Sequence, residues 1–468
     1  MKVYVRRIVA VLTAAVLSVG IFAGCGRKTG DKTKDGRTLI TVGNWPAQKG
    51  KALDRANEQK AEFEKANPDV SVKGDNWVFD IQTFYAKAAG GKVPGVYSTA
   101  YTEIPEIINN GYSADISKAL KKYKIADKFN PQILSLVSKG DAVYSYPTDA
   151  YVLGLSYNTE LFAKAGLLES DGTPKQPKNW DEVAEFAVKI KKATGKAGIV
   201  FPTMANNGGW IFTPLAWSFG VNFMEKDKNG KWKATFDTPE AVAALSYIKD
   251  LKWKYDVLPS NTLIDGNEMY KVFGVGDAGM ICAAGLISDY VATYGMKPEQ
   301  FGIMAYPAGP KRHVTLLGGA LMSVNSTYTD DQIDAAVRWI MTKNNCTLTN
   351  EYKKTQEDQL KNSIEAGYLV GVKNMTTWKS DTETIRYRNE LIDKYSNVNP
   401  NQVRLYNEFV ENCPAEIQAE EPVCAQELYS ILDTCIQNVL TDKNADCKAL
   451  IKSANKDFQK NYLDNLTY

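Results

Sequence analysis

Three tryptophans stand where an α/β protein meets its ligand. Trp45 and Trp77 each fall at or just past the end of a predicted strand, and Trp210 follows the polar loop 206–209 (NNGG). The carboxyl ends of strands in an open α/β sheet form the edge that faces a ligand. Flat aromatic faces with polar groups at their rim bind the C–H faces and hydroxyl edges of a sugar without covalent chemistry. Each tryptophan could equally pack in the core, and the sequence leaves both roles open.

Polar candidates accompany these rings. Asp149 and Tyr151 lie in a short PTDAY segment between two predicted α/β units. The Asp149 carboxylate would accept hydrogen bonds from two sugar hydroxyls, or it caps a turn. Gly318 and Gly319 form a pair that lets backbone segments approach closely. Trp378 is the last aromatic candidate, with a weaker positional argument than the first three.

Several kinds of chemistry are excluded. The chain has one histidine, His313, which nearly rules out His-ligated zinc and Ser-His-Asp catalysis. Residues 274–279 (GVGDAG) fit the dinucleotide fingerprint, but a predicted helix at 267–273 precedes them and a predicted strand at 280–283 follows. That order is the reverse of the one a nucleotide site requires. The net charge of +2 gives no electrostatic footprint for nucleic acid. We expect no cofactor, no metal and no nucleic-acid partner.

The N-terminus has the pattern of an export signal. Three positive charges lie within residues 1–7, and the uncharged, mostly apolar stretch 8–24 follows them. That stretch is on the short side of the ~20 residues that a membrane-spanning helix needs. Cys25, preceded by an alanine and a glycine, resembles the lipobox of bacterial lipoproteins, in which the cysteine is lipidated. We therefore predict a signal peptide at 1–24, a lipid on Cys25, a flexible charged tether at 25–37, and a body held outside the membrane by its lipid alone.

The body alternates strands and helices in two successive runs. Short links between alternating strands and helices favour a parallel sheet covered by helices on both faces, with ligands at the open sheet ends. Two such runs predict two lobes. The first run has predicted strands at 38–45, 70–72 and 93–99 and predicted helices at 50–66, 81–88 and 104–110. The second has predicted strands at 152–157 and 198–201 and predicted helices at 159–165 and after the cap Asn179.

Ordered motifs identify a family. They include 91–96 (GKVPGV), 157–167 (YNTELFAKAGL), 179–182 (NWDE) and 306–310 (YPAGP). From about residue 38 onward the chain resembles the bacterial extracellular solute-binding proteins of family 1, the sugar-binding lipoproteins of ABC transporters. The resemblance implies an α/β, two-lobed periplasmic-binding-protein-like fold of type II, with the lobes joined by hinge crossovers. The expected lobes are 38–150 plus 313–355 and 151–312 plus 356–468.

The resemblance also implies a function. Tyr101 and Thr102 follow the third predicted strand, in the family's ligand loop. The family implies a monomeric carrier that binds a carbohydrate, expected to be an oligosaccharide, between its lobes. By the same resemblance, this carrier is expected to deliver the sugar to the permease subunits of an ABC transporter, with a partner ATPase supplying the energy. The chain departs from the family where it has Gly95 in place of the usual Asp and Leu286 in place of a frequent Trp.

Two other classes stay open. A secreted, membrane-anchored glycoside hydrolase needs only two carboxylates in an aromatic cleft, and counting acids does not exclude it. A cell-surface adhesion module would share the tether but lack a cleft that closes. The four cysteines from 413 to 447 either pack as small apolar residues or form one or two disulfides.

Overall fold

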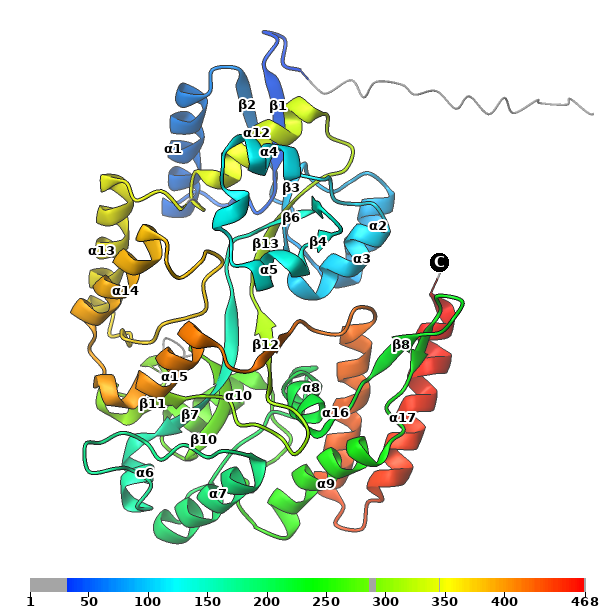
Figure 1. Ribbon diagram of the computed structural model, residues 1–468, viewed down its shortest axis with the longest axis vertical. Helices are drawn as coiled ribbons and strands as arrows, with labels where there is room; N and C mark the ends of the chain where they lie inside the picture. The colour runs from blue at the N-terminus through cyan, green and yellow to red at the C-terminus, as the bar shows by residue number, and fades with distance from the viewer. Residues whose placement is uncertain (1–31, 286–291, 345, 467–468) are drawn as a thin grey trace, which may run out of the picture.

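Two lobes, each built on its own sheet, lie one above the other in Figure 1. This computed structural model describes residues 32–285, 292–344 and 346–466. Residues 1–24 and Cys25 therefore lie outside the described residues, as does Leu286. Within the described chain no helix is long and apolar enough to cross a membrane.

The first lobe contains a five-stranded sheet in the order β2-β1-β3-β13-β6. β1 runs parallel to both β2 and β3, while β13 is antiparallel to β3 and β6. The strands are β1 (Thr38–Val42), β2 (Val70–Gly74), β3 (Val96–Ala100), β6 (Ser145–Pro147) and β13 (Ala320–Val324). In β1 and β2 buried and partly exposed residues alternate, so the sheet presents its apolar face to helices.

Helices cover this sheet. Helix α1 ends before Asn67-Pro68, as the sequence predicts. Asp80 caps α2, because its side chain accepts a hydrogen bond from the backbone N–H of Thr83. The helices are α1 (Lys51–Ala66), α2 (Ile81–Ala89), α3 (Ile104–Asn109), α4 (Ser117–Lys122), α5 (Pro131–Leu136) and α12 (Asp330–Met341). A small hairpin, β4 (Ser138–Lys139) and β5 (Ala142–Val143), follows α5.

The second lobe is organised around the long strand β7 (Tyr151–Asn158). β10 (Met280–Ala284) pairs along one edge, and β11 (Phe301–Met304) and β12 (Val314–Gly318) share the other. All three are antiparallel to β7, and β14 (Glu416–Gln418) adds to β12 in parallel. Seven of the eight residues of β7 are buried, so this strand is the centre of the lobe's core.

The helices of the second lobe surround that sheet. Asn179 caps α7 by accepting the N–H of Glu182, as predicted, while the Glu182 carboxylate accepts the N–H of Lys178. The C-terminal helices pack on α8 and α9 (Figure 1). These helices are α6 (Thr159–Lys164), α7 (Trp180–Thr194), α8 (Asn207–Phe219), α9 (Pro239–Trp253), α10 (Gly266–Gly274), α15 (Pro400–Asn412), α16 (Ala425–Thr441) and α17 (Cys447–Asn461). A hairpin of β8 (Met224–Lys226) and β9 (Trp232–Ala234) lies against α17.

The chain crosses between the sheets from β6 to β7 and from β12 to β13. The second crossing falls after Gly318, because β12 pairs with β7 up to that residue. The helices α13 (Asn350–Glu365) and α14 (Glu383–Tyr395) lie beside these crossings, at the left of Figure 1.

Two local predictions are wrong. Residues 198–201 do not form a strand: the N–H groups of Gly198 and Ile199 share the carbonyl of Val257, and only Ala197 forms a bridge, with Ala278. The N–H of Val200 still donates to the carbonyl of Met280 in β10, and a Cβ on Gly198 would overlap the backbone of α7. The segment therefore follows β10 but bends at Gly198, where it packs closely on the helix.

The described part of the expected tether is also folded. Lys32 forms an isolated antiparallel β-bridge with Thr38, and a hydrogen-bonded turn joins Thr33 to Arg37. Backbone hydrogen bonds next to β1 fold residues 32–37, five of which are charged or polar, and charge composition alone does not reveal these bonds.

Candidate functional site

The crossings bring four of the predicted site residues together. The hydroxyl of Tyr101 donates to the carbonyl of Asp149 at 3.2 Å, and Tyr151 begins β7 two residues later. A Cβ on Gly318 would overlap the Tyr151 ring, and one on Gly319 would overlap the Asp149 carbonyl. Gly319 also has φ +145°, a backbone conformation that favours glycine. The pair of glycines therefore permits the close approach that the sequence predicts.

Thr102 and Trp210 meet across the two lobes through a residue that sequence reasoning missed, Glu420. The Thr102 hydroxyl, just after β3, donates to Glu420 Oε2 at 2.6 Å. The Trp210 indole N–H, in the first turn of α8, donates to Glu420 Oε1 at 2.9 Å. Glu420 itself lies in the segment that joins β14 to α16. One carboxylate thus accepts a hydrogen bond from each lobe.

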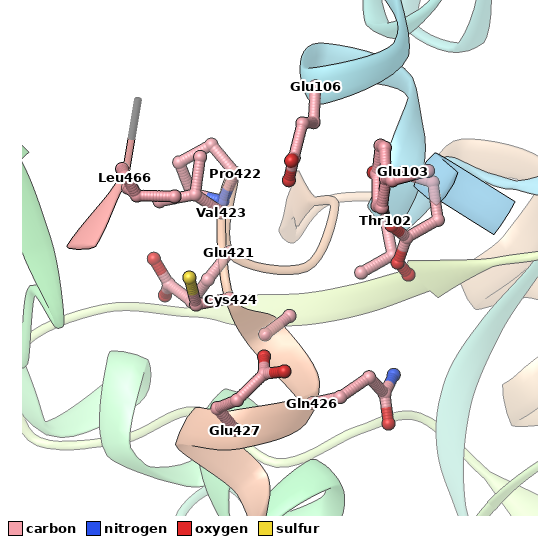
Figure 2. Close-up of a pocket in the computed structure, with 12 residues that line it drawn as sticks. Thr102, Glu103, Glu106, Glu421, Pro422, Val423, Cys424, Gln426, Glu427 and Leu466 are labelled. Atoms are coloured by element: carbon pink, nitrogen blue, oxygen red, sulfur yellow. Dashed lines mark hydrogen bonds between the residues drawn. The ribbon is translucent and has the colours of Figure 1, made fainter. Parts of the chain in front are cut away.

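An acidic cavity of about 220 Å³ lies beside this contact (Figure 2). The first lobe contributes Glu103 and Glu106, and the start of α16 and the segment before it contribute Glu421 and Glu427. Within the described part of the chain, no lysine or arginine lines this cavity. The space between the lobes is therefore polar and, on this side, rich in carboxylates.

Burial changes the protonation of two of these carboxyl groups. Glu103 is 8% exposed, and burial raises its pKa to about 7, although the Tyr85 hydroxyl donates to it at 2.8 Å. Glu421 is 4% exposed, and burial raises its pKa to about 7 as well, opposed by the Trp217 indole N–H at 2.8 Å. Both groups are partly protonated near neutral pH.

The other predicted tryptophans have different surroundings. Trp45 stacks on Trp339 with ring centroids 6.1 Å apart and covers Gly74 of β2. Trp77 packs in a small aromatic cluster of the first lobe with Phe84, and its buried indole nitrogen has no hydrogen-bond partner among the described residues. Their described contacts belong to the first lobe, so the structure does not bring these two rings to Glu420.

Trp378 lies on the opposite flank of the crossings. It is 7% exposed and stacks on Phe129 with centroids 4.1 Å apart. Although the expected domain division assigns it to the second lobe, it therefore packs on the first. It also lines a cavity of about 240 Å³ with Asp149 and Arg388. Partial burial raises the pKa of Asp149. The backbone N–H of Ala150 and the charge of Arg388 act in the opposite direction and lower this pKa.

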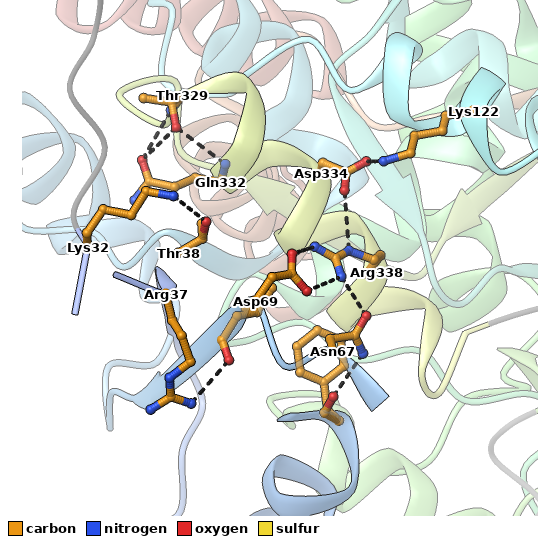
Figure 3. Close-up of polar contacts among 12 residues, drawn as sticks. Lys32, Arg37, Thr38, Asn67, Asp69, Lys122, Thr329, Gln332, Asp334 and Arg338 are labelled. Atoms are coloured by element: carbon orange, nitrogen blue, oxygen red, sulfur yellow. Dashed lines mark hydrogen bonds and ion pairs between the residues drawn. The ribbon is translucent and has the colours of Figure 1, made fainter. Parts of the chain in front are cut away.

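Other polar clusters have structural roles. Arg338 forms ion pairs with Asp69 at 2.8 Å and with Asp334 at 3.3 Å, and Lys122 pairs with Asp334 at 2.7 Å (Figure 3). These contacts tie α12 to α4 and to the turn before β2. His313 places Nε2 3.0 Å from the carbonyl of Tyr306.

The described residues contain no cluster of three or more side chains placed to hold a metal ion. The six cysteines from 282 to 447 are free thiols. The reversed order around 274–279 is confirmed, since α10 precedes this segment and β10 follows it.

The chain belongs to the family of bacterial extracellular solute-binding proteins, whose sequence model matches residues 45–344. The putative ABC transporter periplasmic-binding protein YcjN of Escherichia coli is 25% identical over 283 residues, which is 56% of this chain and 57% of that protein. The arabinooligosaccharide-binding protein of Bacillus subtilis is 26% identical over 250 residues, 52% of this chain and 54% of that protein. The sn-glycerol-3-phosphate-binding periplasmic protein UgpB of Brucella abortus is 28% identical over 300 residues, 61% and 60% of the two chains. The matched region thus spans between half and two thirds of these relatives.

Solved structures confirm the predicted fold. Maltose-bound MalE3 of T. maritima superposes with a TM-score of 0.61 and 22% identity, covering 90% of this chain and 99% of that one. The cyclic α-maltosyl-1,6-maltose-binding protein of Arthrobacter globiformis gives a TM-score of 0.63 and 22% identity, covering 90% and 98%. The two-lobed α/β fold of type II periplasmic binding proteins is therefore the fold of this chain.

Proposed function

We propose that this chain is the substrate-binding subunit of an ABC importer and holds a carbohydrate, of oligosaccharide size, between its lobes. The observation that carries the proposal is the Thr102–Glu420–Trp210 contact, which joins hydrogen-bonding groups and an aromatic ring from both lobes in one place. Hydroxyl-binding groups beside an indole are the components of sugar recognition. Membership of the solute-binding family and the relatives named for arabinooligosaccharide and maltose support this ligand class.

Delivery follows from closure of the lobes. The two crossings next to Asp149 and Gly319 are the hinge, and ligand bound between the lobes stabilises the closed arrangement. A permease then recognises the closed surface and accepts the sugar unchanged. The chain acts as a monomer and performs no catalysis.

The anchor completes the proposal. Residues 1–24 direct export, Cys25 carries the lipid, and residues 26–31 connect it to the turn at 32–37. The protein then works at the extracytoplasmic face of the membrane, close to its permease.

A panel of neutral oligosaccharides tests the function. The right ligand should shift the tryptophan fluorescence, because Trp210 lies at the contact, and should raise the melting temperature by mass action. Chromatography of the recovered sugar separates the carrier from a glycoside hydrolase: intact sugar at a one-to-one ratio supports the carrier, and shortened products contradict it. No response across the panel would contradict a carbohydrate ligand.

A further inference from the structure

Glu420 has the contacts of a residue that selects the ligand. Its two carboxylate oxygens accept one hydrogen bond each, from Thr102 at 2.6 Å and from Trp210 at 2.9 Å. A carboxylate offers about four lone-pair positions. The Tyr429 hydroxyl also interacts with this carboxylate, and the positions that it leaves open can accept from donors on a bound molecule. It is partly buried, so water competes less for these positions than at an open surface.

The charge around Glu420 has one sign. Glu421 follows it directly, and Glu103, Glu106 and Glu427 line the adjoining cavity. Arg312, whose charge acts on Glu421, is already engaged by Glu416 at 2.6 Å and by Gln418 at 2.9 Å. A negatively charged group of a ligand would therefore face carboxylates here. Among the described residues that line the cavity there is no lysine or arginine to neutralise it.

We propose that Glu420 is a specificity-determining residue of the cleft: it accepts hydrogen bonds from the hydroxyls of an uncharged ligand and rejects phosphorylated or carboxylated ones. This inference rests on the proposed function. A sugar hydroxyl donates and accepts, so it can use the free lone pairs of Glu420. A phosphate dianion offers only acceptors, which repel this carboxylate and leave both sides without donors.

The inference separates two kinds of relatives. One is named for an arabinooligosaccharide, which is uncharged, and another for sn-glycerol-3-phosphate, which is an anion. The charge at Glu420 places this chain with the first kind.

Two variants test the role of Glu420. Glu420→Gln removes the charge and keeps the size of the side chain, while Thr102→Val removes the donor from the first lobe and keeps the charge. The probes are arabinotriose and maltotriose, each with its monophosphorylated form, and the readout is affinity by calorimetry at pH 8. Glu185→Gln, exposed on α7, is the matched control. Circular dichroism and melting curves establish that each variant is folded.

The expected pattern is specific. The wild type and Glu185→Gln should bind a neutral trisaccharide at least tenfold more tightly than its phosphorylated form. Glu420→Gln should reduce that ratio at least tenfold. Thr102→Val should weaken binding of the neutral form but keep the ratio, since the carboxylate remains. Should Glu420→Gln not fold, the ratio in Thr102→Val and in the wild type still decides.

Failure has two distinguishable forms. Equal binding of the neutral and phosphorylated sugars by the wild type, or an unchanged ratio in Glu420→Gln, overturns the role of Glu420 and leaves the carrier function standing. Binding of none of the neutral sugars, here or in the wider panel, contradicts the proposed function and this inference with it.

Discussion

Replacing Glu421 by glutamine should make the protein less sensitive to pH. This carboxyl group is 4% exposed and its pKa is raised to about 7 from the ordinary 4.5 by burial. The folded state therefore holds a proton that the unfolded chain releases between about pH 4.5 and pH 7. The stability from this proton is fully present below pH 4.5 and is lost as the pH rises through 7.

The size of the effect follows from the same pKa. Each pKa unit corresponds to about 1.4 kcal/mol, so the ionised carboxylate at pH 8 costs the folded state about 3 kcal/mol. Glu421→Gln mimics the protonated form, and its carbonyl can still accept the Trp217 indole N–H, which lies 2.8 Å from Glu421. The variant should therefore lie within about 1 kcal/mol of the wild type near pH 5 and exceed its stability by up to about 3 kcal/mol at pH 8.

Urea unfolding at pH 5 and pH 8, followed by circular dichroism, measures this difference. Glu185→Gln serves as the control because its side chain is exposed on α7. If the free energies of unfolding of Glu421→Gln and the wild type differ by the same amount at both pH values, burial does not raise the pKa of Glu421 as inferred.

Three further predictions concern the hinge, a polar cluster and the anchor. Gly319→Ala should cost about 3 kcal/mol by urea unfolding, against about 1 kcal/mol for Gly367→Ala, because both have positive φ but only Gly319 lacks room for a Cβ; equal costs would contradict the close approach. Arg338→Gln should lower stability by about 1 kcal/mol at pH 7, since one of its two carboxylate partners, Asp69, is largely exposed. Because Arg338 lowers the pKa of Asp69, this loss should shrink as the pH falls below the ordinary 3.8, and a loss that persists at pH 2 would exclude the ion pair. Cys25→Ser should move the protein from the membrane to the soluble fraction of its host, and retention in the membrane would contradict lipid anchoring.

Local sequence signals predicted the elements well where periodicity and caps coincide. The helix that follows Asn179 begins at Trp180, and the break at Asn67 ends α1. Trp180 is buried, as its place in a predicted helix indicates. These features depend on residues within one turn of each other, so a single segment specifies them.

Pairing between distant segments was not predictable in the same way. β7 was expected to begin a second parallel unit, yet its partners β10, β11 and β12 come from more than 100 residues downstream and are all antiparallel to it. A buried strand with no alternation carries no signal for the direction of its neighbours.

The candidate site shows the same division. Thr102 was predicted from its place after the third strand, in the ligand loop of the family, and Trp210 from the polar loop before it; both take part in the cross-lobe contact. Glu420 was missed because it lies in an irregular segment, where only the neighbouring Glu421 and the surrounding apolar residues could have drawn attention to it. Its importance comes from two partners that are 318 and 210 residues away.

Small-angle X-ray scattering, with and without a neutral oligosaccharide that binds, tests most directly whether this chain grips its ligand between two lobes. We predict a smaller radius of gyration in the bound state, with the sugar recovered intact afterwards. An unchanged radius at saturating ligand, or a shortened sugar, would contradict it.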